Sequence, residues 1–155
     1  MSWYSYFLLN VPETLLMLVI TLLLLGFSIK EHAKPILLVA FLQGAVAFAL
    51  SIYMQNPLKP FVTIITFTVL VAFLFKRTML QGFTIALIAF FILSFYEITF
   101  SLINMYVFDA DYTAIQADPW KRVTTGFITI QLPMLVTVLL LLKFKLKINI
   151  PFLIK

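Results

Sequence analysis

One polar stripe carries groups that could do chemistry inside an otherwise apolar segment. Ser94, Glu97, Ser101 and Asn104 are spaced by three, four and three residues, which places them on one face of a helix. Glu97 is the only acidic residue well inside an apolar run, and an ionisable group there is costly enough to suggest a function. We expect these four residues, together with Gln131, to form a ligand-binding surface.

Two roles for Glu97 remain open from the sequence. In the functional role its carboxyl lines an outward-facing cavity that receives a ligand, an ion or a proton. In the structural role it needs no partner, because Glu97 lies about 20 residues, or ~30 Å of helix, beyond Arg77 and so can reach the opposite headgroup region.

The elements that position this stripe follow from hydropathy. The chain has 155 residues, 63% of them hydrophobic and 11% charged, so its apolar surface exceeds what the polar shell of a small soluble domain could cover. A helix needs ~20 mostly apolar residues to span a bilayer. We predict an all-α polytopic bundle, a single domain over residues 1–155, with five spans near residues 11–29, 35–54, 60–76, 80–106 and 123–143.

Helix boundaries are marked by capping chemistry. Asn10 is expected to act as an N-cap, with Pro12 in the first turn and Glu13 completing an arrangement like a capping box. Asp118 followed by Pro119 gives a similar start signal before the last span.

The basic residues predict an orientation. Lys and Arg in short loops are held on the cytoplasmic side of a membrane, and with the N-terminus outside only Lys59, Lys121 and Arg122 fall on the outer side. The acidic residues Asp109 and Asp111 fall there too. The remaining eight basic residues fall inside, and they are Lys30, Lys34, Lys76, Arg77, Lys143, Lys145, Lys147 and Lys155. We therefore expect a multi-pass protein of the cell membrane with an N-out, C-in topology.

Two further features concern helix packing. Small residues in the second span let a neighbouring backbone approach closely, and Gln43 can hydrogen-bond across that face. Pro133 removes a backbone bond to the Thr129 carbonyl and is expected to kink the last span. The small residues are Ala40, Gly44, Ala47 and Ser51.

Several classes of chemistry are excluded. The chain has no Cys and one His, His32, so thiolate chemistry, Cys-ligated metals and histidine-rich metal sites cannot be built. His32 is expected in a solvated loop. No nucleophile elbow, zinc motif, phosphate loop or dinucleotide fingerprint occurs, so we expect no catalysis, cofactor or metal. The basic residues lie at the ends of apolar runs and not in a patch with aromatics, which argues against nucleic acid.

Five features occur along the chain at the ends of the predicted spans or within them: N-P-L-K-P-F at Asn56–Phe61, the basic pair Lys76–Arg77, Glu97, D-P-W-K-R at Asp118–Arg122 and Q-L-P at Gln131–Pro133. In this layout, the chain from Pro12 to Lys147 resembles the multi-helix membrane sensor regions of Gram-positive histidine kinases of the GHKL class and their stand-alone relatives. The resemblance implies a receptor-like domain that responds to a peptide, lipid or envelope signal. The chain departs from these kinases because no phosphoacceptor or ATP-binding domain follows the last span.

Three functions follow as hypotheses. The first is a non-catalytic bacterial membrane protein, sensor-like, that relays a signal to a cytoplasmic partner such as a kinase. The second is a small transporter or channel subunit in which Glu97 and Gln131 contact the moving ion or substrate. The third is a structural subunit of a larger complex that docks through the small residues of the second span. All three hypotheses include the lipid bilayer as a partner, and each leaves a homo-oligomer open.

Overall fold

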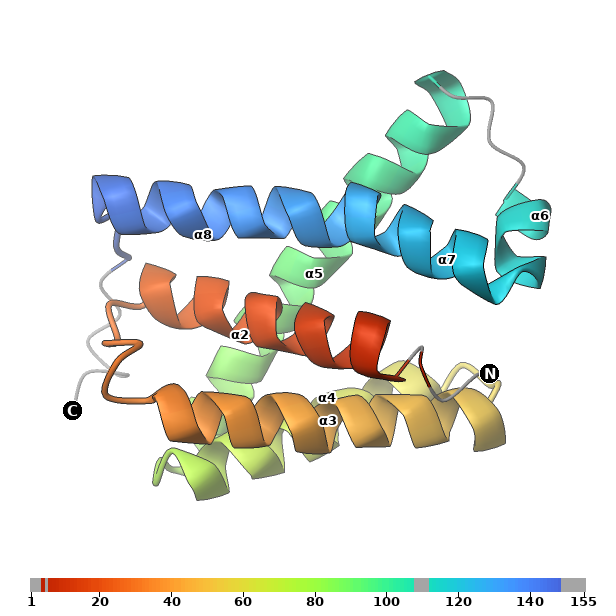
Figure 1. The fold of residues 1–155 in the computed structure, drawn as a ribbon. Coiled ribbons are helices and arrows are strands. Elements are labelled where there is room, and N and C mark those ends of the chain that lie inside the picture. Colours follow the sequence, from red (N-terminus) through yellow and green to blue (C-terminus); the bar gives the residue numbers. More distant parts are fainter. Residues whose placement is uncertain (1–3, 5, 108–111, 149–155) are drawn as a thin grey trace.

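Helices make up every regular element in the described part of the chain (Figure 1). The computed structural model describes residue 4 and residues 6–107 and 112–148; Asp109, Asp111 and Lys155 lie outside them. The predicted all-α class is therefore confirmed for these residues. The elements are η1 Tyr6–Asn10, α2 Val11–Leu24, α3 Ala33–Tyr53, α4 Lys59–Leu74, α5 Met79–Val107, α6 Tyr112–Ala117, α7 Pro119–Gly126, η2 Phe127–Gln131 and α8 Leu132–Phe144, where η denotes a π-helical segment.

Among the described residues, three helical segments are long and apolar enough to cross a membrane. They are Ala33–Tyr53, Met79–Tyr106 and the joined α7, η2 and α8 from Pro119 to Phe144. The apolar segments Leu8–Leu24 and Lys59–Leu74 are shorter. Each of the five predicted windows thus coincides with a helical segment, although their ends differ.

The predicted cap at Asn10 is wrong. Asn10 has helical backbone angles (φ −65°, ψ −43°) and makes no side-chain cap hydrogen bond. The chain is already helical from Tyr6 onward, so the backbone groups that a cap would satisfy lie upstream. By contrast, Asp118 is extended and its carboxylate accepts a hydrogen bond of 3.0 Å from the Trp120 amide, which confirms the predicted start signal.

The first apolar helix ends at Leu24, earlier than the predicted boundary near residue 29. Gly26 takes a positive φ of 83°. The amide of Gly26 donates to the Leu23 carbonyl, and that of Phe27 donates to the Leu22 carbonyl. These two bonds form a Schellman motif, which ends a helix regardless of the hydropathy that follows.

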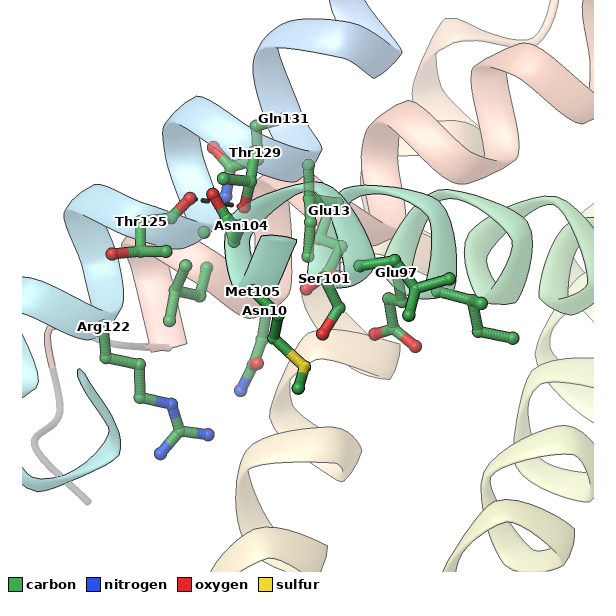
Figure 2. A pocket seen from close by; sticks show the side chains of 15 residues that line it. Asn10, Glu13, Glu97, Ser101, Asn104, Met105, Arg122, Thr125, Thr129 and Gln131 are labelled. Atoms are coloured by element: carbon green, nitrogen blue, oxygen red, sulfur yellow. Dashed lines mark hydrogen bonds between the residues drawn. The ribbon is translucent and has the colours of Figure 1, made fainter. Parts of the chain in front are cut away.

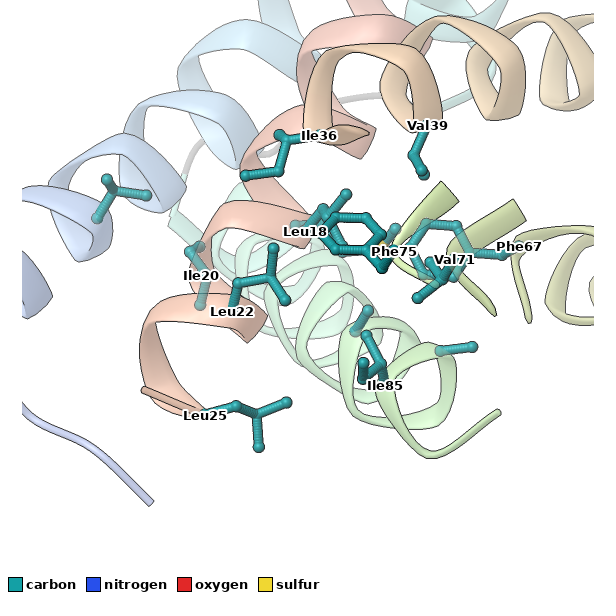
Figure 3. Close-up of a cluster of buried hydrophobic side chains, with 14 of the residues drawn as sticks. Leu18, Ile20, Leu22, Leu25, Ile36, Val39, Phe67, Val71, Phe75 and Ile85 are labelled. Carbon is teal, nitrogen blue, oxygen red and sulfur yellow. The ribbon is translucent and has the colours of Figure 1, made fainter. Parts of the chain in front are cut away.

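The core is built around α2, which lies between α8 and α3 and in front of α5 in Figure 1. Leu18 and Leu22 are fully buried, as are Phe67 and Val71 of α4. Figure 3 shows these side chains converging with Ile85 of α5. The outside is also apolar, since Phe73 is 80% exposed and Phe91 is 75% exposed. Such a surface suits a lipid environment.

α4 and α5 approach each other closely at Gly82. A Cβ at this position would lie 2.8 Å from the Thr68 carbonyl oxygen and 3.0 Å from the Ala72 Cβ. Only glycine permits this spacing without moving a backbone. The start of α5 is fixed by a capping box in which the Thr78 amide donates to the Gln81 Oε1, and the Gln81 amide donates to the Thr78 Oγ1.

The small residues of α3 are used inside the chain. Ala40 and Gly44 are buried, and Ala47 and Ser51 are partly exposed. Next to them, the Gln43 amide donates to the Thr63 carbonyl of α4 at 3.2 Å. Ala40 and Gly44 are therefore already covered by this chain, and they are not free to dock another protein.

One end of the bundle is held together by aromatic and basic side chains. His32 stacks on Phe75 and packs edge-on against Phe27, while the Arg77 guanidinium lies 4.9 Å from the Phe27 ring centroid. The His32 Nδ1 donates to the Ser28 carbonyl at 2.8 Å. His32 lies in the turn before α3 and is partly exposed, as expected for a loop residue, but its ring also packs into this cluster.

Candidate functional site

A pocket of about 550 Å³ lies at the opposite end of the bundle from the His32 cluster. Its walls come from η1, α2, α5, α7 and η2, which are distant in sequence. Figure 2 shows their side chains converging on one space. The charged and amide-bearing residues that line it are Asn10, Glu13, Glu97, Asn104, Arg122 and Gln131.

Four of the five residues predicted to bind a ligand line this pocket. Glu97, Ser101 and Asn104 reach it from α5, and Gln131 reaches it from η2. Ser94 does not line the pocket, although it belongs to the same sequence stripe. The reason is geometric, since α5 crosses the bundle obliquely (Figure 1) and only the last part of the stripe faces α7 and η2.

Glu13 is a second acidic residue of the pocket that the sequence interpretation assigned to helix capping. It lines the same pocket as Glu97 and Arg122 and lies near both. Two acidic groups and one basic group therefore share the space. The sequence could have indicated that Glu13 and Arg122 lie close together. Glu13 begins one predicted span and Arg122 precedes another, and both positions fall on the same predicted side of the membrane.

Asn10 contributes a polar group that lacks a partner. Its side-chain nitrogen is buried, and it makes no hydrogen bond to any of the residues that the structure describes. The backbone carbonyl of the same residue accepts from the Thr14 hydroxyl at 2.8 Å. A buried donor without an acceptor costs roughly 1–3 kcal/mol, so a ligand acceptor at this point of the pocket wall would be favourable.

Arg122 is positioned by the start of α7. The Asp118 cap fixes the first turn, and the Arg122 amide donates to the Asp118 carbonyl at 3.0 Å. The Trp120 ring stacks on Tyr4 with centroids 5.0 Å apart. These contacts anchor the first turn of α7 near the N-terminal segment, so Arg122 approaches the pocket from a fixed backbone.

Gln131 joins two segments across the pocket wall. It is 5% exposed, and its side-chain amide donates to the Leu8 carbonyl of η1 at 2.8 Å. A second close approach lies nearby, since a Cβ on Gly126 would come within 2.8 Å of the Leu9 side chain. The pocket wall is thus closed by contact between η1 and the end of α7.

Both π-helical segments border the pocket. Each ends two residues before a proline: η1 at Asn10 before Pro12, and η2 at Gln131 before Pro133. Proline cannot donate the backbone bond of a regular α-helix, and single-turn π segments are frequent at functional sites. The predicted disturbance at Pro133 therefore takes the form of a π turn, after which the rod of α7 and α8 changes direction in Figure 1.

The donors and acceptors of the pocket suit binding. Carboxylates and the Ser101 hydroxyl can accept, while Arg122, Asn10 and Asn104 can donate. No group of three or more His, Asp or Glu residues able to hold a metal occurs among the described residues. Comparisons with known family models, curated proteins and solved structures gave no match to this chain.

Proposed function

We propose that this protein is a non-catalytic, multi-pass protein of the bacterial cell membrane that binds a ligand in the pocket and relays binding to a cytoplasmic partner. The observation that carries the proposal is the convergence of Glu97, Asn104 and Gln131 with Glu13 and Arg122 on one space. An arrangement that gathers scattered polar residues within an apolar bundle is typical of a binding site.

Five spans fit this proposal, with the N-terminus outside and the C-terminus inside. Besides the three long segments, α4 of 16 residues is about 24 Å long, and Leu8–Leu24 is similar. Helices of this length are accommodated by local thinning of the bilayer or by side chains that extend to the interface. The pocket then lies in the outer half of the membrane.

A route for the relay is provided by the helices themselves. α2 and α5 line the pocket at one end, and at the other end their neighbouring loops meet where Arg77 packs on Phe27. The segment after α8 joins the same end, because the Ile148 amide donates to the Leu24 carbonyl. A change in the spacing of α2, α5 and α8 at the pocket would therefore alter contacts at the cytoplasmic end.

Hydrogen exchange in lipid nanodiscs tests the relay without a known ligand. Ser101→Trp places a bulky ring in the pocket, and Ser94→Trp places the same ring on α5 outside it. We expect Ser101→Trp to change backbone exchange at residues 25–32, 75–78 and 145–148, and Ser94→Trp to leave it at the wild-type level. Equal exchange at these residues in both variants would reject the relay.

Transport is a second candidate, favoured by the fact that Glu97 and Gln131 line the same pocket. In this case the carboxyl would carry or accompany a proton or cation. Proteoliposomes containing a pH-sensitive dye, placed under an imposed proton gradient, would show flux that Glu97→Gln abolishes. A flat trace for the wild-type protein would dismiss proton-coupled transport.

A further inference from the structure

The pocket continues onto the outer surface of α5. Three large apolar residues of α5 line it, and each is also exposed on the outside of the molecule: Ile98 by 62%, Leu102 by 48% and Met105 by 52%. These side chains share the apolar exterior with Phe95, which is 61% exposed. In a membrane this exterior faces acyl chains, so the pocket opens sideways into the bilayer and not only toward water.

The pocket carries ionisable groups of both signs. Figure 2 shows Arg122 and Glu97 at opposite ends of the space, with Asn10, Ser101 and Met105 between them. The unpartnered Asn10 nitrogen adds a donor, and Glu13 adds a second acidic group. A ligand of a single charge would pair with either Arg122 or Glu97, whereas a ligand that carries both charges could pair with both.

We propose that the pocket binds the headgroup of an amine-bearing zwitterionic phospholipid. The ammonium group pairs with the carboxylate of Glu97, and the phosphate pairs with Arg122 and accepts from the Asn10 amide. The acyl chains leave through the lateral opening and lie on Ile98 and Leu102. The volume of about 550 Å³ is in the range of small-molecule sites, which is more than a single ion needs.

This inference rests on the proposed function, since it names the ligand class of the same pocket. The chemistry that it requires, an amine and a phosphate joined by a short linker, also occurs in free phosphoethanolamine. The lateral opening favours the lipid source, because a soluble molecule gains nothing from the exposed apolar residues of α5. A competition experiment between the phospholipid and free phosphoethanolamine distinguishes the two sources of the headgroup.

Native mass spectrometry of the full chain released from nanodiscs tests the proposal. The wild-type protein is offered phosphatidylethanolamine and phosphatidylglycerol at equal fractions, and we expect about tenfold preferential retention of phosphatidylethanolamine. Glu97→Gln should abolish the preference, and Arg122→Gln should reduce retention of phosphatidylethanolamine. Lys121→Gln is the matched control, because Lys121 adjoins Arg122 but does not line the pocket, and it should behave as the wild type.

Equal retention of the two lipids by the wild-type protein would overturn the proposal, and this comparison needs no variant to fold. Displacement of the bound lipid by free phosphoethanolamine at matched concentration would overturn the lipid source. The exchange comparison of Ser101→Trp with Ser94→Trp uses no lipid selectivity. If the two Trp variants show equal exchange while the wild-type protein still prefers phosphatidylethanolamine, the relay alone is rejected. If the two variants differ in exchange while the wild-type protein retains both lipids equally, the lipid site alone is rejected.

Discussion

At the scale of single residues, Gln131 both lines the pocket and holds its wall together. Replacing it with leucine removes the hydrogen bond to Leu8 and leaves that carbonyl without its donor. We expect Gln131→Leu to lower the free energy of unfolding by about 1 kcal/mol, measured by titration with sodium dodecyl sulfate. Gln55→Leu makes the same change at an exposed position and should have little effect. A matching loss at both positions would contradict the structural role of Gln131.

The candidate site was predictable in part, for reasons visible in particular residues. Glu97, Ser101 and Asn104 share one helix, so their spacing alone places them on one face. Asn10 ends η1 and Glu13 begins α2, and their sequence resembles a cap signal that a helical start at Tyr6 overrides. Which helices meet depends on side-chain packing between them, and periodicity along one helix carries no information about it.

At the scale of helices, we expect replacement of two glycines by alanine to have opposite effects on stability. A methyl group on Gly82 would meet the Thr68 backbone carbonyl, whereas one on Gly126 would meet the end of the flexible Leu9 side chain, each at 2.8 Å. Alanine favours a helix over glycine by about 1 kcal/mol at either position, so only the steric cost differs.

We expect Gly82→Ala to lower the free energy of unfolding by about 1–2 kcal/mol, because α4 and α5 must move apart. Gly126→Ala should leave it unchanged or raise it by up to about 1 kcal/mol, because Leu9 can turn aside. Detergent-based unfolding of both variants in parallel gives the comparison. The interpretation of the α4–α5 contact is wrong if Gly82→Ala is the more stable of the two.

Hydropathy located the helices better than their ends. The five apolar windows each coincide with a helical segment, because a long apolar run has few other ways to satisfy its backbone. The end of α2 was misplaced because the Gly26 turn lies within a run that is still apolar. The π turns were missed because a proline predicts that a regular bond is lost, and neighbouring contacts such as that between Gln131 and Leu8 determine how the helix adapts.

At the scale of the whole molecule, the basic residues of the described part of the chain lie toward the two ends of the bundle. Arg77 and the chain after α8 meet at the end where Phe27 lies, and Lys145 belongs to that end as the cap of α8. Lys121 and Arg122 lie at the start of α7, at the pocket end. Because short basic segments are retained in the cytoplasm, the pocket is expected to face outward.

Single-cysteine labelling tests this topology directly, since the chain has no Cys of its own. In intact cells, a membrane-impermeant maleimide should label Gln55→Cys and Lys121→Cys, and should reach Lys76→Cys and Lys145→Cys only after permeabilisation. All four positions are exposed, so burial does not explain a difference between them. Leu140→Cys, exposed on α8 within the predicted span, should stay unlabelled in both conditions. Labelling of Lys145→Cys in intact cells would reverse the orientation, and equal labelling of Gln55→Cys and Lys76→Cys would show that α4 does not cross the membrane.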